Sequence, residues 1–444
     1  MVSRTRFVPI ALLALVVFAF ALICGTTIGQ ARSQTDPPIE ITFWHAMSRS
    51  RGKVLERLVA KFNETHPGVH VNSVCIQSAN KQYGNDYNAL YSRILESIAK
   101  NTPPDVAQVY ENWTTQYVGI DALVPVEDLI PANDKSFVSD LVPIFLTANT
   151  FTGKDGKKLY TVPFNKSIYV LYYNKNIFNE LGLKPPTTWQ ELRKAAKAIH
   201  DKKGIPGLAF VPSVDVFGHY LYSYGGTFIS KDNKAAFGGK LGTEGLNYWV
   251  DLVHKDASAL PTFEASRVFE NGKAGMYIET TSRIGGFEKA RASGLNFGVL
   301  PIPKGTTQSS QFAGTNLAIF RGSESDIDKQ MAAYEFVSYM CSTDVTIDWS
   351  INTGYLPVRK SALKSSTYID YINKHPEYVV GVKSLDKATV QPRVPVWESL
   401  RSILDDAMFK ALGRKCDSET AINEAVDTSN RLLELVGTYS VSSN

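Results

Sequence analysis

The sequence predicts an α/β protein built from two lobes. The chain has 444 residues, more than the roughly 100–200 of a single domain. Strand-like segments alternate with helix-like segments, and this alternation restarts near residue 167. At 44% hydrophobic and 20% charged residues, the composition supports a buried core and excludes a disordered chain or a coiled coil.

The first lobe is predicted from apolar residues that alternate in strand-like segments and recur at helical spacing in helix-like ones. The expected elements are a strand at 39–43, a helix at 54–62, a strand at 69–74, a helix at 87–98 and a strand at 105–110. Strands that alternate with helices favour a parallel sheet, because the crossover helices must cover its faces.

The second lobe is predicted from the same alternation further along the chain. The expected elements are a strand at 167–173, helices at 189–199 and 243–254, strands at 207–211 and 275–279, and a helix from residue 397 onward. A strand at 316–320 and a helix at 327–337 are expected where the chain has returned to the first lobe. Thr188-Trp189-Gln190-Glu191 is a capping box, so we expect the first of these helices to begin directly after Thr188.

Two segments rich in glycine or proline, 151–160 and 300–305, are the expected crossings between the lobes. Lobe I would then comprise 39–150 plus 306–352, and lobe II 151–305 plus 353–438. A chain that crosses more than once between two α/β units leaves a hinge and a cleft, which suits a ligand-binding protein.

The first 31 residues have the pattern of a secretory signal peptide. An apolar run over 7–23 follows Arg4 and Arg6 and precedes small residues that end at Ala31, where we expect cleavage. The bulky residue before Cys24 argues against a lipid anchor. No later stretch reaches the roughly 18 apolar residues of a membrane span, so we expect an exported, soluble protein.

The charge and the cysteines exclude several further classes. Basic and acidic side chains, 47 and 43, nearly balance, which argues against electrostatic binding of nucleic acid. His66 and His70 are separated by a turn, so we expect no metal site, and we expect no cofactor.

The cysteines of the mature chain are Cys75, Cys341 and Cys416. They are odd in number and form no C-x-x-C pair, so we expect free thiols, although one disulfide among the three is an alternative.

Catalytic motifs are absent from the sequence, while aromatic residues suited to ligand binding are frequent. We find no G-x-S-x-G, H-E-x-x-H or G-x-x-x-x-G-K-[ST] pattern. Two distant acids could still form a secreted carbohydrase, which remains a minor alternative. Tyr and Trp side chains offer an apolar face and a hydrogen bond to a polar, non-aromatic molecule, and several follow predicted strand ends: Trp44, Tyr87, Tyr110, Trp113 and Tyr355.

Five short segments carry a family resemblance, and they span most of the mature chain. They are Phe43-Trp44-His45-Ala46-Met47, Gln108-Val109-Tyr110-Glu111, Pro163-Phe164-Asn165, Leu171-Tyr172-Tyr173-Asn174-Lys175 and Thr353-Gly354-Tyr355-Leu356-Pro357. In this order they resemble the glycerol-3-phosphate-binding proteins of bacterial ABC importers. The resemblance implies a monomeric, non-enzymatic, two-lobed periplasmic binding protein of type 2, like maltose-binding protein, which delivers its ligand to a membrane permease with separate ATPase subunits.

The resemblance also nominates ligand-binding residues. The positions that match family contacts are Tyr87, Glu111, Ser167, Gly314, Tyr355 and Arg401. Thr281 and Ser282 stand where the family has a serine-rich phosphate loop, and as donors at a helix start they could still bind an anion. In the family, the acid accepts hydrogen bonds from glycerol hydroxyls and the arginine pairs with the phosphate. Because a carboxylate repels phosphate, we expect Glu111 and Arg401 on opposite walls of one cleft.

The sequence departs from the family in the stretch 210–220. Relatives have tryptophans there against the glycerol end of the ligand, whereas this stretch contains no tryptophan. The resemblance therefore leaves three ligands open: glycerol 3-phosphate, a glycerophosphodiester, and a sugar or oligosaccharide.

Overall fold

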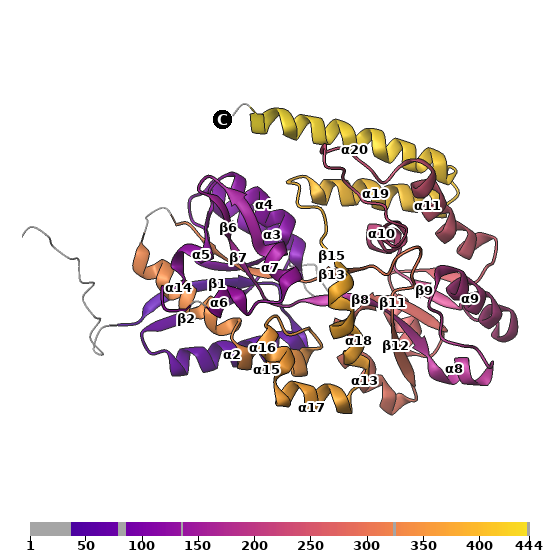
Figure 1. The fold of residues 1–444 in the computed structure, drawn as a ribbon, viewed down its shortest axis with the longest axis horizontal. Helices are drawn as coiled ribbons and strands as arrows, with labels where there is room; N and C mark the ends of the chain where they lie inside the picture. The colour runs from indigo at the N-terminus through magenta and orange to yellow at the C-terminus, as the bar shows by residue number, and fades with distance from the viewer. Residues whose placement is uncertain (1–36, 79–85, 135, 323–325, 442–444) are drawn as a thin grey trace, which may run out of the picture. The chain divides into compact units, whose positions relative to one another are not determined.

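The computed structural model describes residues 37–78, 86–134, 136–322 and 326–441, with side chains described up to residue 436. The chain from Ile39 onward forms one compact unit. Among the described residues, its strands form two large sheets and one separate hairpin (Figure 1). The predicted signal peptide and Cys24 lie outside the described residues.

The first sheet has the strand order β2-β1-β3-β14-β4, and β7 also pairs with β14. Its strands are β1 (Ile39–His45), β2 (Val69–Cys75), β3 (Val106–Val109), β4 (Leu123–Val124), β7 (Thr161–Pro163) and β14 (Asn316–Phe320). β1 is parallel to β2 and β3, whereas β14 is antiparallel to β3, β4 and β7. The expected parallel sheet is therefore mixed, because β14 arrives from the second sheet and not through a helical crossover.

The helices of the first lobe pack by their apolar faces. In α2 (Arg49–Thr65), Leu55, Leu58 and Phe62 are buried in the core that also contains Ile41 and Phe43 of β1. The helices that follow along the chain are α3 (Tyr87–Ala99), α4 (Glu111–Gly119), α5 (Val126–Leu129), α6 (Ser136–Ser139), α7 (Pro143–Asn149), α14 (Ile327–Met340), α15 (Thr343–Thr353) and α16 (Lys360–Lys364).

The second sheet has the order β10-β9-β11-β8-β13-β15, with β12 also paired with β8. Its strands are β8 (Ser167–Asn174), β9 (Leu208–Phe210), β10 (Ala259–Pro261), β11 (Met276–Thr280), β12 (Phe297–Pro301), β13 (Ser310–Ala313) and β15 (Ala388–Thr389). β9 is parallel to β10 and β11, whereas β8 is antiparallel to β11, β12 and β13. This sheet is also mixed.

The helices of the second lobe include the predicted capping box. At the start of α9 (Trp189–Lys203), the Thr188 side chain accepts a hydrogen bond from the Glu191 backbone N–H. The Glu191 side chain in turn accepts one from the Thr188 backbone N–H. α10 (Val214–Ser223) and α11 (Gly239–His254) contact the C-terminal helices α19 (Trp397–Leu412) and α20 (Ser418–Val441) (Figure 1). The remaining helices are α8 (Lys175–Glu180), α12 (Ala265–Glu270), α13 (Ile284–Ala290), α17 (Ser366–Lys374) and α18 (Glu377–Ser384).

The chain passes between the two sheets at 164–166, from β7 to β8, and at 314–315, from β13 to β14. The predicted crossing at 151–160 is instead the hairpin of β5 (Thr150–Gly153) and β6 (Gly156–Leu159). The predicted crossing at 300–305 joins two strands of the second sheet. Glycine and proline mark a turn, but they do not show which sheets the turn connects. Our boundaries placed β7 in lobe II and β13 in lobe I. In the structure, β7 pairs in the first sheet and β13 in the second.

Candidate functional site

A cavity of about 260 Å³ lies beside the two crossings and is lined by residues of both lobes. Its aromatic wall consists of Tyr87, Tyr110, Trp113, Tyr169 and Phe312, and its charged groups are Glu111, Asp215, Glu398 and Arg401. Aromatic faces together with a few polar groups are typical of a small-molecule site. This cavity is the candidate functional site.

Chain turns at strand ends and helix starts bring these side chains to the cavity. β3 ends at Val109, and α4 begins at Glu111 with Tyr110 as its N-cap. In the second lobe, Asp215 lies in the first turn of α10, and Glu398 lies in the first turn of α19. Acidic side chains are favoured near helix N-termini because the helix dipole is positive there.

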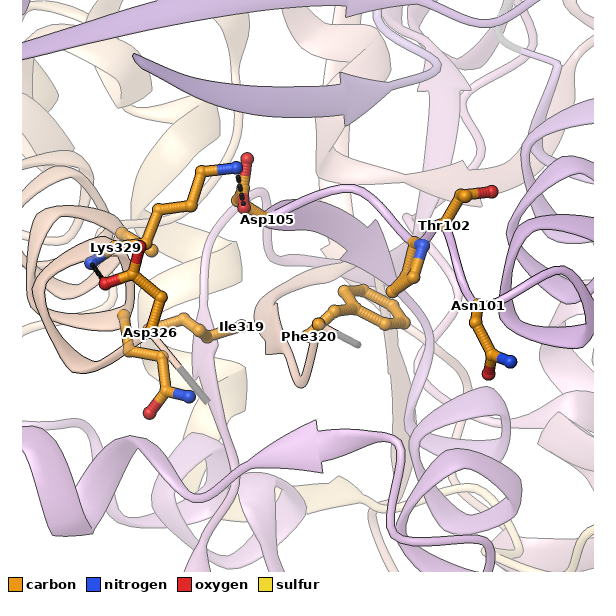
Figure 2. Close-up of a pocket in the computed structure, with 11 residues that line it drawn as sticks. Asn101, Thr102, Asp105, Ile319, Phe320, Asp326 and Lys329 are labelled. Atoms are coloured by element: carbon orange, nitrogen blue, oxygen red, sulfur yellow. Dashed lines mark hydrogen bonds and ion pairs between the residues drawn. The ribbon is translucent and has the colours of Figure 1, made fainter. Parts of the chain in front are cut away.

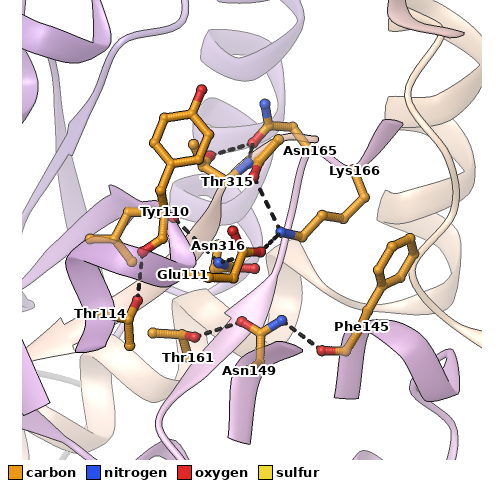
Figure 3. Close-up of polar contacts among 12 residues, drawn as sticks. Tyr110, Glu111, Thr114, Phe145, Asn149, Thr161, Asn165, Lys166, Thr315 and Asn316 are labelled. Atoms are coloured by element: carbon orange, nitrogen blue, oxygen red, sulfur yellow. Dashed lines mark hydrogen bonds and ion pairs between the residues drawn. The ribbon is translucent and has the colours of Figure 1, made fainter. Parts of the chain in front are cut away.

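On the first-lobe wall, Glu111 forms a buried ion pair with Lys166 (Figure 3). Lys166 Nζ donates to Glu111 Oε1 at 2.5 Å and to the Gly314 carbonyl oxygen at 3.3 Å. Asn316 Nδ2 donates to the same carboxylate oxygen at 3.2 Å. Burial lowers the pKa of Lys166, and Glu111 opposes that shift. The charge of Glu111 is therefore matched by a cation from the crossing segment 164–166.

The two crossings touch each other next to this ion pair. Asn165 Oδ1 accepts hydrogen bonds from the Thr315 backbone N–H at 3.1 Å and from the Thr315 hydroxyl (Figure 3). Gly314 has φ of +108°, and a Cβ placed there would lie 1.8 Å from the Asn165 carbonyl oxygen. Only glycine fits this position, both for its left-handed backbone and for the close approach of the two segments.

On the second-lobe wall, Arg401 forms a two-point ion pair with Asp215. Arg401 Nη1 donates to Asp215 Oδ1 at 2.9 Å, and Nη2 donates to Oδ2 at 2.8 Å. Burial acts to raise the pKa of Asp215, but Arg401 outweighs it and holds that pKa below its ordinary value. The pair is therefore ionised, and its two charges cancel.

Glu398 forms no ion pair among the described residues, although it acts electrostatically on Arg401, the cation of the neighbouring pair. Its Oε1 accepts a hydrogen bond from Asn112 Nδ2 at 2.8 Å and from Trp113 Nε1 at 3.3 Å. These bonds connect α19 of the second lobe with α4 of the first lobe. The carboxylate therefore both joins the lobes and leaves a net negative charge at the cavity.

Four of the eight predicted site residues line this cavity: Tyr87, Glu111, Gly314 and Arg401. Glu111 and Arg401 lie in different lobes and belong to different ion pairs. Arg401, however, is not an unpaired cation that awaits a phosphate. The sequence resemblance gave no sign of its carboxylate partner.

The other four predicted site residues are absent from the cavity wall. Ser167 is buried and pairs with Ala313 in the second sheet. The Thr281 hydroxyl accepts a bond from the Ile168 backbone N–H at 3.4 Å. Ser282 and Tyr355 lie beside Arg51, whose Nη2 donates to the Ser282 carbonyl oxygen at 2.8 Å and whose guanidinium lies 5.1 Å from the centroid of the Tyr355 ring.

Sequence reasoning missed Asp215, Glu398, Tyr169 and Phe312, which line the cavity. One signal was available. Asp215 lies within the stretch 210–220 that lacks the family's tryptophans, and it begins a helix directly after a strand. The loss of the tryptophans from this stretch could have indicated that another of its residues takes their place.

A second cavity, of about 470 Å³, lies at the opposite end of β14 from Gly314 (Figure 2). Its charged groups already have partners. Asp105 pairs with Lys329 at 3.0 Å and accepts hydrogen bonds from Thr42, while Asp326 caps α14. None of the predicted site residues lines it, and its acids Asp105 and Asp326 already have partners, so we do not consider it the functional site.

Comparison with known proteins defines the class. Residues 57–376 match the family of bacterial extracellular solute-binding proteins, and the chain belongs to this family. It is 26% identical over 437 residues to the sn-glycerol-3-phosphate-binding periplasmic protein UgpB of Brucella abortus, covering 93% of this chain and 95% of the relative.

Solved structures share the fold. The acarbose receptor GacH of Streptomyces glaucescens superposes with a TM-score of 0.77 at 24% identity, over 90% of this chain and 99% of the receptor. UgpB of Mycobacterium tuberculosis, bound to glycerophosphocholine, gives 0.77 at 19% identity, over 91% and 100%. The fold is thus that of the two-lobed, maltose-binding-protein-like receptors, as predicted. In the part of the chain that the structure describes, no helix is long and apolar enough to cross a bilayer.

Proposed function

We propose that this protein is the periplasmic receptor of an ABC importer and that its ligand is a hydroxyl-rich solute without net charge, foremost a saccharide. One observation carries the choice of ligand: Arg401, the cation that lines the cavity, is already paired with a carboxylate, and so is Lys166 beside it. Lys166 pairs with Glu111, Arg401 pairs with Asp215, and Glu398 adds a further negative charge. Hydroxyl groups can bond to such pairs without having to displace either partner.

The aromatic wall supports the same choice. Tyr87, Tyr110 and Trp113 form a continuous set of ring contacts with centroid distances of 5.0–5.1 Å. Such a surface packs against the C–H faces of a sugar ring, while the carboxylates accept hydrogen bonds from the hydroxyl groups of the sugar. Because ligand contacts come from both lobes, the ligand would stabilise the arrangement in which the lobes meet, and the permease would recognise that state.

A zwitterionic glycerophosphodiester is the second candidate, and Glu398 is the observation that favours it. An unpaired carboxylate beside Trp113 and Tyr110 suits a cationic group, since aromatic faces also attract cations. The similarity to UgpB proteins agrees with this class of ligand. Glycerol 3-phosphate is a weaker candidate than the sequence alone suggested, because its dianion would meet the carboxylates of Asp215, Glu111 and Glu398.

A thermal-shift screen tests the proposal. The purified mature protein is heated with maltose, trehalose, glycerophosphocholine or glycerol 3-phosphate. Ligand at 1,000 times its Kd stabilises the native state by about 4 kcal/mol, so a true ligand raises the melting temperature clearly. We expect the rise with a saccharide or with the zwitterion. A rise with glycerol 3-phosphate alone would refute the charge argument, and turnover of a chromogenic glycoside would indicate a carbohydrase.

A further inference from the structure

The side chain of Asp215 occupies one of the two faces of Arg401 that can bind an anion at two points and balances its charge. A guanidinium binds phosphate best through two parallel N–H groups. Here the two Nη atoms donate to the two oxygens of Asp215 at 2.9 and 2.8 Å. Nη1 also donates to Gln391 Oε1 at 3.4 Å. The donors that remain, Nε–H and one Nη2–H, form the second parallel pair of the guanidinium, but the positive charge behind them is already balanced by Asp215.

Asp215 is held in this position by the second lobe itself, without any ligand. It lies in the first turn of α10, where the helix dipole favours a carboxylate. Gln391 Nε2 donates to its Oδ1 at 3.2 Å. The adjacent Val214 backbone N–H is bonded to Asp405 at 2.6 Å, which fixes the start of the helix. The side chains of Arg401 and Asp215 keep only 23% and 12% of their surface exposed, so the pair forms part of the cavity wall.

We propose that Asp215 is the specificity-determining residue of this cavity: by pairing with Arg401 it directs the site to uncharged hydroxyl-rich ligands and excludes phosphate anions. This inference rests on the proposed function and names the residue behind it. A phosphate that approached the Nε side of Arg401 would meet a cation already balanced by Asp215 and would lie close to that carboxylate. A phosphate that took the Nη face would have to displace Asp215, whose carboxylate would stay in a partly buried site without its counter-charge, which is costly.

Asp215→Asn is the direct test. Asparagine keeps the shape of the side chain but removes its charge, so Arg401 becomes available to an anion. We expect isothermal titration with glycerol 3-phosphate, and separately with inorganic phosphate, to give a Kd at least about tenfold lower for the variant than for the wild type, as expected when one charge-assisted hydrogen-bonded contact is gained.

Glu398→Gln is the matched control. It removes one negative charge from the same cavity but leaves the Arg401–Asp215 pair in place, because Glu398 bonds to Asn112 and Trp113 instead. We expect this control to improve phosphate binding by less than about threefold, the part due to net charge alone. The double variant Asp215→Asn with Arg401→Met should lose the gain, which would assign it to Arg401.

The experiment separates this inference from the proposed function. If Asp215→Asn gains no affinity for either phosphate probe, or no more than Glu398→Gln, the role of Asp215 is refuted even when the wild type binds a saccharide. If the wild type binds no saccharide or diester but the variant gains phosphate binding, the role of Asp215 stands and the assigned ligand class fails. Circular dichroism verifies folding, and Asp215→Ser serves as a second variant if the asparagine variant does not fold.

Discussion

At the scale of single residues, the main feature of the cavity is that its cations are paired. Lys166 is fully buried, and its partner Glu111 is 12% exposed at the side chain. A buried cation requires a counter-charge, because the water that it gives up on burial stabilises charge strongly. The ion pair therefore couples the fold at the crossing to the chemistry of the site.

Replacing Lys166 tests this coupling. Lys166→Met should destabilise the protein by about 3–5 kcal/mol, since Glu111 is left with a buried and unmatched charge. The double variant with Glu111→Gln should recover a large part of that loss. Urea denaturation of Lys166→Met and of the double variant, each compared with the wild type, measures both effects. The control is Lys197→Met, whose ion pair with Asp201 is about half exposed and contributes no more than about 0.5 kcal/mol. Equal losses for the two lysines would contradict the prediction.

The sequence indicated site residues that belong to a recognisable local or family pattern. It did not indicate those whose role depends on a partner far away along the chain. Glu111 was nominated from the short segment 108–111 and Gly314 from its match to a family contact, and both line the cavity. Lys166 and Glu111 are 55 positions apart, and Asp215 and Arg401 are 186 positions apart. No periodicity or spacing in the sequence reports such a pairing, because it is set by the tertiary packing of segments that are distant along the chain.

At the scale of elements, the sequence predicted the strands and helices well. The capping box at Thr188 was confirmed, since its pattern depends on four consecutive residues. The crossings at 151–160 and 300–305 were wrong in position, because the glycines and prolines there form turns within one lobe. The actual crossings are marked by little more than Asn165 and Gly314, whose role depends on a contact between segments 150 positions apart.

Gly314 provides a test of the second crossing. Gly314→Ala should cost more than about 3 kcal/mol, because the strained left-handed backbone adds to a clash with the Asn165 carbonyl oxygen. The matched control is Gly294→Ala. Gly294 has φ of +96°, but a Cβ there would have no heavy atom within 4 Å. It should cost only the backbone strain, about 1–2 kcal/mol.

Thermal or urea unfolding of both glycine variants distinguishes the two contributions. If the two substitutions cost the same, the close contact between the crossings has no energetic importance and only the backbone angle matters.

At the scale of the whole molecule, two buried histidines make stability depend on pH. Burial lowers the pKa of His45, in the first sheet, and of His219, in α10, from 6.5 to about 4. The unfolded chain binds protons at these sites below pH 6.5, whereas the native protein does so only below about pH 4. Their contribution to stability is therefore present above pH 6.5 and is lost as the pH falls from 6.5 to 4.

The size of this effect is about 3 kcal/mol for each histidine at pH 4. We expect urea unfolding at a series of pH values from 7.5 to 4.5 to show a steady loss of stability. His45→Gln and His219→Gln should each make the dependence shallower by part of the total. A dependence unchanged in both variants would show that other groups are responsible.

The position of β14 has a consequence for how the protein is made. This strand lies between β3 and β4 in the first sheet, yet it is formed by residues 316–320. After β4 has been synthesised, the ribosome must add the strands β8 to β13 of the second sheet before β14, the neighbour that β3 and β4 lack, is made. Throughout that interval the N-terminal strands have an open edge, so the nascent chain stays incomplete and a fragment that ends before residue 316 cannot assemble the first sheet.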